Sequence, residues 1–389
     1  MTAVILTIVC ALLLVPALVF FVEVLAAVMP GDAPSAPIAG PLRLAVLIPA
    51  HDEETTIGRT LRSVAAQLRA SDRLLVVADN CSDQTAQIAQ DEGAEVIRRE
   101  SQDLRGKGYA LDHGVRHLEK DPPDVVIIID ADCVVSSGSL ATLAAAAQAA
   151  GAPAQAIDLM RAPEGAGLRV RIAEFAWLIK NRVRPQGLRR MGLPCQLMGT
   201  GMAFPWACIR ASSLATGHLV EDLKLGIELA RRGLPPRFCT AATVSSEFPT
   251  SDEGIRSQRT RWEHGHLRAI LSEVPKLLFG AIIRRDAALA AMALDLSVPP
   301  LALLAMAIAA SWAISLGVEL TARASLPFFL ASVAAVLFGC AVTLSWRVFG
   351  RGTVSGKDLV MAAVYAIWKV PLYLGFLLKP QSKWVRSKR

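Results

Sequence analysis

The stretch from Val125 to Asp132 reads VVIIIDAD, an unbroken apolar run followed at once by two carboxylates. Its first five residues are β-branched, which is typical of a strand buried on both faces. On a strand, residues two apart point to one face, so Asp130 and Asp132 would present both carboxylates to one site. Such hard oxygen ligands suit Mg²⁺ or Mn²⁺, which also bind substrate phosphates. The alternative is a solvated strand end with turn-forming aspartates, which the pair taken alone slightly favours.

Predicted strands and helices alternate in the chain before this stretch. Their order is strand 44–48, helix 57–68, strand 74–78, helix 84–91 and strand 94–97. Such alternation predicts an α/β fold with a Rossmann-like, doubly wound sheet. Ligands of these sheets bind beyond the carboxyl ends of the strands, so the polar residues found there are candidates for a functional site.

Polar residues follow the first two predicted strands. Glu53 comes shortly after the first strand, and Asp79 ends the second. Their carboxylates could accept hydrogen bonds from a nucleotide base or from ribose hydroxyls. The alternative is local, because Asp, Asn and Ser cap helices and form turns, and for Asp52 and Ser82 we favour it. Lys107, between two glycines, could reach a phosphate, although its spacing is not that of a P-loop.

Glu221 and Asp222 precede a predicted helix and could supply a general base. Acids in a first helical turn also stabilise the helix dipole, which is a common alternative. Gly199 and Thr200, followed by Gly201, lie a short way upstream. A loop of this kind lets the backbone approach a bound sugar closely.

Gln258, Arg261 and Trp262 stand at positions i, i+3 and i+4, so they share one face of a helix. The planar fork of Arg261 can bind two diphosphate oxygens, and Trp262 can stack on a sugar ring. An interfacial helix anchored by its tryptophan is the alternative, and these three residues in isolation favour it.

Long apolar runs indicate a membrane protein. Hydrophobic residues make up 53% of the 389 residues, more than a soluble globular protein needs. The runs cover 4–29, 298–316, 326–344 and 359–378, and a bilayer is crossed by ~20 apolar residues in a helix. A cleaved signal peptide is disfavoured for the first run, because no basic region precedes it.

The net charge of +7 comes largely from basic residues beside these apolar runs. They lack the interleaved aromatics of a nucleic-acid surface, so we expect membrane lipids with anionic headgroups, and no nucleic acid, as partners. The seven cysteines are scattered without the spacing of a metal site, which indicates reduced thiols.

Taken in order along the chain, these motifs resemble those of membrane-bound family 2 glycosyltransferases, a superfamily that includes cellulose, hyaluronan and chitin synthases. The bacterial exopolysaccharide branch associated with methanolan synthesis is the most similar. The resemblance runs from about Leu44 to Leu267. It implies a GT-A fold and a nucleotide-sugar donor, often a UDP-sugar.

The resemblance also assigns roles to the motif residues. Glu53 and Asp79 match the acids that bind uridine, Asp130 the acid at the nucleotide and metal, and Asp132 the metal ligand. Asp222, beside Glu221, matches the general base that deprotonates the acceptor hydroxyl. Gly199 and Thr200 match a loop near the acceptor sugar, and Gln258, Arg261 and Trp262 match the QxxRW element that holds diphosphate and acceptor.

Two motifs depart from the usual family pattern. Val220 stands where many synthases have threonine, and His51 and Asp52 replace an aromatic-Asn pair. Neither change removes a carboxylate. No second carboxylate need act as a nucleophile, so the resemblance implies direct displacement with inversion at the anomeric carbon.

The expected organisation combines these segments. It has a transmembrane helix and linker over 1–42, a cytosolic GT-A domain over 43–268 with an interfacial segment at about 165–190, and an interfacial region over 269–297. Two transmembrane helices over 298–345 precede a cytosolic loop and basic tail over 346–389, in which 359–378 lies in the interface or re-enters. The basic loop after the second of these helices agrees with an inner-membrane orientation that leaves the catalytic domain in the cytoplasm.

Three full spans are few for an enzyme that builds its own polymer channel. We therefore keep two enzymatic interpretations, each for exopolysaccharide or cell-surface glycan assembly. One is polymer extension with help from a second copy or an export partner, and the other adds one sugar to a lipid-linked acceptor, as in ceramide glucosyltransferase-like enzymes. A non-catalytic nucleotide-sugar-binding subunit is the third alternative.

Overall fold

The computed structural model describes residues 2–30, 41–217, 220–249 and 251–378. Residues 31–40 of the expected linker and the basic tail over 379–389 lie outside the described residues. The described chain forms two compact units. The sheet unit comprises 41–163 and 194–257, and the helical unit comprises the residues up to 30, Glu164–Leu193 and the chain from Gln258 onward.

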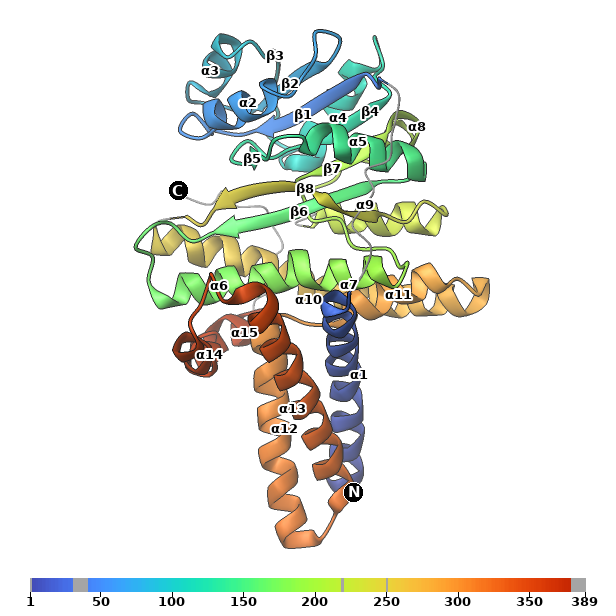
Figure 1. Ribbon diagram of the computed structural model, residues 1–389, viewed down its shortest axis with the longest axis vertical. Helices are drawn as coiled ribbons and strands as arrows, with labels where there is room; N and C mark the ends of the chain where they lie inside the picture. Colours follow the sequence, from blue (N-terminus) through green and yellow to red (C-terminus); the bar gives the residue numbers. More distant parts are fainter. Residues whose placement is uncertain (1, 31–40, 218–219, 250, 379–389) are drawn as a thin grey trace. The chain divides into compact units, whose positions relative to one another are not determined.

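The sheet unit holds one eight-stranded mixed sheet with the order β3-β2-β1-β4-β7-β6-β8-β5 (Figure 1). The strands are β1 (Leu44–Ala50), β2 (Arg73–Asp79), β3 (Glu95–Arg99), β4 (Val125–Ile128), β5 (Val134–Val135), β6 (Ala154–Arg161), β7 (Met202–Pro205) and β8 (Arg237–Glu247). The first four are parallel to one another, and β7 then joins β4 in antiparallel orientation. The predicted strands are thus confirmed, and the sheet continues into a mixed half.

Helices cover both faces of this sheet. They are α2 (Ile57–Ala65), α3 (Thr85–Asp91), α4 (Lys107–Leu118), α5 (Ser139–Ala150), α8 (Trp206–Arg210) and α9 (Glu221–Arg231). Alternate residues of β1 point to opposite sides, because Val46 packs in one core with α2 and α5, whereas Leu47 packs in the other with α4 and α9. The doubly wound GT-A-like α/β fold expected from the sequence is confirmed.

The carboxylates of Asp130 and Asp132 lie in a turn. Strand β4 ends at Ile128, and the backbone N–H of Cys133 donates to the carbonyl of Asp130 at 3.1 Å. The expectation that Asp130 and Asp132 share a strand face is therefore wrong. The last paired residues of β1 and β4 are Leu47 and Ile128, so the chain after β4 can turn.

The helical unit contains the apolar helices. Its elements are α1 (Thr2–Val28), α6 (Leu168–Leu178), the π-helical turn η1 (Ile179–Val183), α7 (Arg184–Arg190), α10 (Asp252–Arg284, in this unit from Gln258), α11 (Ala287–Ser297), α12 (Leu301–Ala322), α13 (Ser325–Ser345), η2 (Trp346–Gly350), α14 (Gly356–Trp368) and α15 (Val370–Leu378). Helices α1, α12 and α13 lie side by side (Figure 1). The two expected interfacial segments are mostly helical, the first from Leu168 to Arg190 and the second through the end of α10 and α11.

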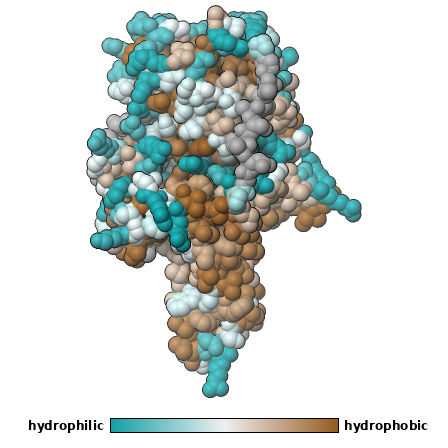
Figure 2. All heavy atoms as spheres, in the orientation of Figure 1, coloured by the Kyte–Doolittle hydropathy of each residue, from teal (hydrophilic) through white to brown (hydrophobic). Residues whose placement is uncertain are grey.

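Four helical stretches of the described chain are long and apolar enough to cross a membrane: Ala3–Val28, Leu301–Ala322, Ser325–Gly350 and Gly356–Phe376. Figure 2 shows hydrophobic residues gathered over the part of the helical unit that holds the first three. The fourth is broken at Lys369 and includes Pro371. Its two helices lie beside the ends of α12 and α13 (Figure 1). These helices indicate a membrane protein.

Glu23, the one acid in the first apolar run, is buried in the helical unit together with Arg184 and Asp295. The Arg184 guanidinium donates to Glu23 Oε2 at 2.5 Å and to Asp295 Oδ1 at 2.6 Å. Helix α7 approaches α1 closely at the same level, since a Cβ atom on Gly187 would lie 1.9 Å from the Glu23 carbonyl oxygen. This ion cluster explains how α1 tolerates a charge in its apolar sequence.

Candidate active site

Lys107 lies at the centre of a cluster of the predicted site residues in the sheet unit. It is the first residue of α4, directly after Gly106, whose φ of +134° suits glycine. Its ammonium pairs with Asp130 Oδ1 and donates to the Gly199 carbonyl at 2.8 Å. Burial alone would lower the Lys107 pKa, but the charges of Asp130, Glu221 and Asp222 outweigh burial and raise it. Lys107 therefore stays charged.

The Gly199–Gly201 loop lies between this cluster and the start of α9. Gly199 and Gly201 have φ of +96° and +63°, which favour glycine. A Cβ atom on Gly199 would lie 3.4 Å from Asp222 Oδ2. Between the glycines, the Thr200 hydroxyl accepts a hydrogen bond from the Asp130 backbone N–H at 3.1 Å. The loop thus contacts both the Asp130 turn and Asp222.

Glu221 and Asp222 form the first turn of α9, as the sequence predicts. Burial, followed by the negative charge of Asp222, raises the pKa of Glu221 to about 7, although Lys107 opposes this rise. The Glu221 carboxyl, with this raised pKa, is therefore partly protonated near neutral pH. A carboxylate pair of this kind can accept a proton from a hydroxyl group.

The Asp130 turn has the chemistry of a hard divalent cation site. The Asp130 carboxylate is 36% exposed and faces Lys107. Asp132 Oδ1 accepts a hydrogen bond from the Cys133 thiol at 3.3 Å. Burial raises the pKa of that thiol well above its ordinary value, so it remains protonated and is a poor metal ligand. Two carboxylates in one tight turn fit Mg²⁺ or Mn²⁺.

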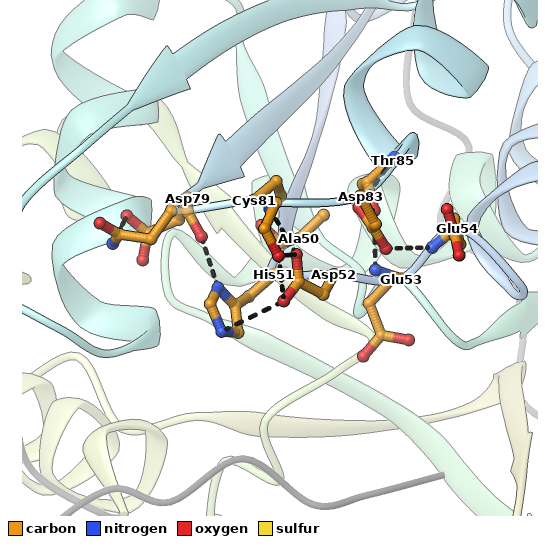
Figure 3. A network of polar contacts seen from close by, with 11 residues as sticks. Ala50, His51, Asp52, Glu53, Glu54, Asp79, Cys81, Asp83 and Thr85 are labelled. Carbon is orange, nitrogen blue, oxygen red and sulfur yellow. Dashed lines mark hydrogen bonds and ion pairs between the residues drawn. The ribbon is translucent and has the colours of Figure 1, made fainter.

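The acids at the first two strand ends lie in a second polar network (Figure 3). Asp79 is buried and accepts from Arg99 at 2.5 Å, a partner that the sequence did not suggest. The Glu53 carboxylate accepts from the Thr56 hydroxyl at 2.8 Å. Asp52 accepts from the backbone N–H of Ser82 at 2.6 Å. Asp52 and Ser82 thus have a structural partner in each other, but the contact joins two loops and is not the local cap or turn that was expected.

Asp52, Cys81 and Asp83 also bring potential metal-ligand atoms within 4.8 Å of one another. Their partners include backbone groups of the loop and the Ser82 and Thr85 hydroxyls. Asp83 accepts from the N–H groups of Glu54 and Thr85, and the Cys81 thiol donates to the Ala50 carbonyl. Figure 3 shows these contacts between the ends of β1 and β2. They order the loop that presents Glu53.

Gln258, Arg261 and Trp262 lie on α10, which confirms their predicted helix. Gln258 is buried, and the other two are partly buried. The Trp262 ring packs on the Trp177 ring of α6, with centroids 4.7 Å apart. These residues belong to the helical unit, whereas Lys107, Asp130, Gly199, Thr200, Glu221 and Asp222 meet in the sheet unit.

Comparison with known proteins supports the resemblance seen in these motifs. Residues 41–265 match the family described as Glycosyltransferase like family 2. The chain is 27% identical over 244 residues to the probable glycosyltransferase YdaM of Bacillus subtilis (strain 168), covering 59% of this chain and 56% of YdaM. It is 24% identical over 245 residues to a poly-beta-1,6-N-acetyl-D-glucosamine synthase of Staphylococcus aureus (strain COL), covering 58% of this chain and 55% of the synthase.

A solved structure shares the fold over nearly the whole chain. The mannosyltransferase PcManGT from Pyrobaculum calidifontis, in complex with GDP-Man and Mn²⁺, superposes with a TM-score of 0.60 at 16% identity, covering 97% of this chain and 100% of PcManGT. The chain spans about half the length of the curated relatives it matches. With the family match covering more than half of its residues, the chain belongs to family 2 of the glycosyltransferases.

Proposed function

We propose that this protein is an inverting, metal-dependent glycosyltransferase that moves a sugar from a nucleotide sugar, most simply a UDP-sugar, to an acceptor hydroxyl. The observation that carries the proposal is the Lys107 cluster. In this cluster the Lys107 ammonium contacts both Asp130, in the turn suited to a cation, and the Gly199 loop. The same loop lies beside Asp222, the acid suited to act as a base. A metal, a diphosphate and an acceptor hydroxyl need these groups together.

Asp130 and Asp132 would hold Mg²⁺ or Mn²⁺, which offsets charge on the leaving diphosphate when bound. The chain's own residues supply the remaining functions. Lys107 is a fixed cation beside Asp130, placed to bind a phosphate oxygen of the donor. Glu53 and Asp79 would bind the nucleotide base and ribose from the neighbouring strand ends.

Asp222 is proposed as the general base for the acceptor hydroxyl. Its Oδ2 lies beside Gly199, where the loop carries no side chain that would block an acceptor. Glu221, with its raised pKa, retains a proton that reduces the charge beside Asp222. Gly199 and Thr200 would contact the acceptor sugar. On α10, Arg261 would bind diphosphate oxygens, while Gln258 and Trp262 would contact the acceptor.

For the membrane arrangement, we propose a bacterial inner-membrane protein with its catalytic domain in the cytoplasm. Helices α1, α12 and α13 would span, and α14 and α15 would lie in the interface. The break at Lys369 and the place of both helices beside the ends of α12 and α13 support that assignment (Figure 1). Labelling of an introduced cysteine at Ser387 from outside intact cells would contradict this topology.

The acceptor is proposed to be a growing polysaccharide or a lipid-linked glycan. The decisive experiment incubates membranes containing the protein with labelled nucleotide sugars and sizes the products. A long polymer indicates a synthase, with a second copy or an export partner forming the channel. A lipid-extractable product carrying one added sugar indicates glycolipid synthesis.

Matched variants test the chemistry in the same assay. Asp222→Asn should abolish transfer while nucleotide-sugar binding persists, because only the base is lost. Retained configuration in the product linkage, seen by NMR, would rule out direct displacement. Nucleotide-sugar binding without transfer to any acceptor would favour the non-catalytic subunit.

A further inference from the structure

The part of α10 that carries Gln258, Arg261 and Trp262 is held from its opposite face by the break between α14 and α15. An α-helix turns about 100° per residue, so Arg261 and Glu263 point about 200° apart. Glu263 forms an ion pair with Lys369, the residue between α14 and α15. The contact therefore lies on the side of α10 that points away from Arg261.

This ion pair is nearly buried. The Glu263 and Lys369 side chains are 13% and 15% exposed. The second carboxylate oxygen of Glu263, Oε2, is also buried, and the Tyr373 hydroxyl of α15 faces the same carboxylate. Removal of the lysine would thus leave a buried carboxylate without its cation, a change that costs far more than the loss of a surface pair.

Contacts of the adjacent residue hold α10 from a second direction, about 100° around the helix from Glu263. The ring Nε2–H of His264 donates to the Leu372 carbonyl at 3.0 Å, and the imidazole packs edge-on against Phe376 at 5.3 Å between centroids. The preceding residue, Glu263, pairs with Lys369, so two adjacent residues of α10 contact both α15 and the break before it. Two contacts at different points define the rotation of α10 as well as its distance.

An aromatic ring adds a third contact. The Arg259 guanidinium lies 5.7 Å and the Lys369 ammonium 5.5 Å from the centroid of the Tyr365 ring on α14. Arg259 and Glu263 are four residues apart and share a helix face. The same face of α10 is thus bound to α14 through Tyr365 and to the break through Lys369.

We infer that Lys369 is a positioning residue for sugar transfer. Through Glu263 it fixes the rotation of α10 and so the places of Gln258, Arg261 and Trp262. This inference rests on the proposed function, which gives those three residues their contacts with diphosphate and acceptor. Lys369 itself touches no reacting atom. It acts by linking α14 and α15 to the helix that carries Gln258, Arg261 and Trp262.

The test compares Lys369→Met with wild type in membranes, using labelled nucleotide sugar and the acceptor that wild type uses. A misplaced helix should lower kcat at least about tenfold. The KM for the nucleotide sugar should change by a smaller factor than kcat. The base-binding acids lie in the sheet unit, away from Lys369, whereas Arg261 on α10 contributes its contact with the donor diphosphate. Lys276→Met is the matched control, since Lys276 pairs within α10 with Glu273 at 3.2 Å and its side chain is 63% exposed.

Two further variants separate positioning from general loss of structure. Lys369→Arg keeps the charge and should retain most of the wild-type kcat, and exchange of the pair by Glu263→Lys with Lys369→Glu should recover activity lost in Lys369→Met. Wild-type kcat in a folded Lys369→Met protein overturns the inference. If Lys369→Met does not fold, an inactive but folded exchange variant overturns it. Wild type without transferase activity would instead refute the proposed function.

Discussion

Replacement of Arg184 by methionine tests the buried ion cluster of the helical unit. The arginine lies between Glu23 on α1 and Asp295 on α11, and the three residues are 6%, 2% and 7% exposed respectively. Methionine keeps much of the length and apolar volume of the arginine stem. The substitution therefore removes the cation with little change in packing and leaves two buried carboxylates facing each other.

The expected loss follows from this geometry. Removal of one partner of a buried ion pair costs about 3–5 kcal/mol, because the remaining charge stays desolvated. Here one guanidinium contacts two carboxylates, at 2.5 Å and 2.6 Å, so we expect a loss of about 5 kcal/mol. Replacement of all three residues by apolar ones, Glu23→Leu with Arg184→Met and Asp295→Leu, should restore most of this stability.

The assay is denaturant unfolding of the purified protein in detergent micelles, followed by circular dichroism. Arg43→Met is the control, because Arg43 pairs with Asp121 where the side chains are 46% and 59% exposed. Its loss should be much smaller, because water screens an exposed pair. If Arg184→Met and Arg43→Met lower the free energy of unfolding equally, the argument for a stabilising buried cluster is refuted.

Three other predictions concern α7, the acid pair and the aspartate turn. Gly187→Ala should destabilise the protein by about 3 kcal/mol or more, since the added Cβ overlaps the Glu23 backbone, whereas Gly167→Ala, with nothing within 4 Å, should be tolerated in the same unfolding assay. The folded-state pKa of Glu221 is about 7 and its ordinary value 4.5, so its stabilising protonation is complete below 4.5 and lost as pH rises through 7. Glu221→Gln should therefore be more stable than wild type at pH 8, by at most about 3 kcal/mol, with the gap closing toward pH 4.5. Asp132→Asn should weaken the Mn²⁺ dependence of nucleotide-sugar binding in calorimetry, and unchanged Mn²⁺ dependence would argue against a metal ligand.

Local patterns in the sequence predicted the parallel half of the sheet well. Leu44–Ile48 and Val125–Ile129 are continuous apolar runs because a strand covered on both faces has no solvated side. The mixed half was not predicted, because the insertion of β7 between β4 and β6 joins segments distant in sequence. The strand pattern also predicted a strand through Asp130, although pairing with β1 ends at Ile128.

The site shows the same division between local and long-range information. Asp222 at a helix start and Gln258 on a helix could be predicted, since capping and periodicity are properties of neighbouring residues. The partners of Lys107 could not, because its contact with Gly199 spans 92 positions. Arg99, the partner of Asp79, gave no sequence signal, as an arginine on a strand is usually solvated.

The sequence by itself determined the α/β class, the apolar helices and the ordered motifs that point to family 2, because each of these depends on spacing within a short stretch. Only the tertiary structure decided that Asp130 lies in a turn, that Lys107 joins this turn to the Gly199 loop, and that Lys369 holds α10 from behind. Those facts depend on charges brought together from distant segments. The energy of a buried charge is set by the partners that the fold supplies, which no local pattern encodes.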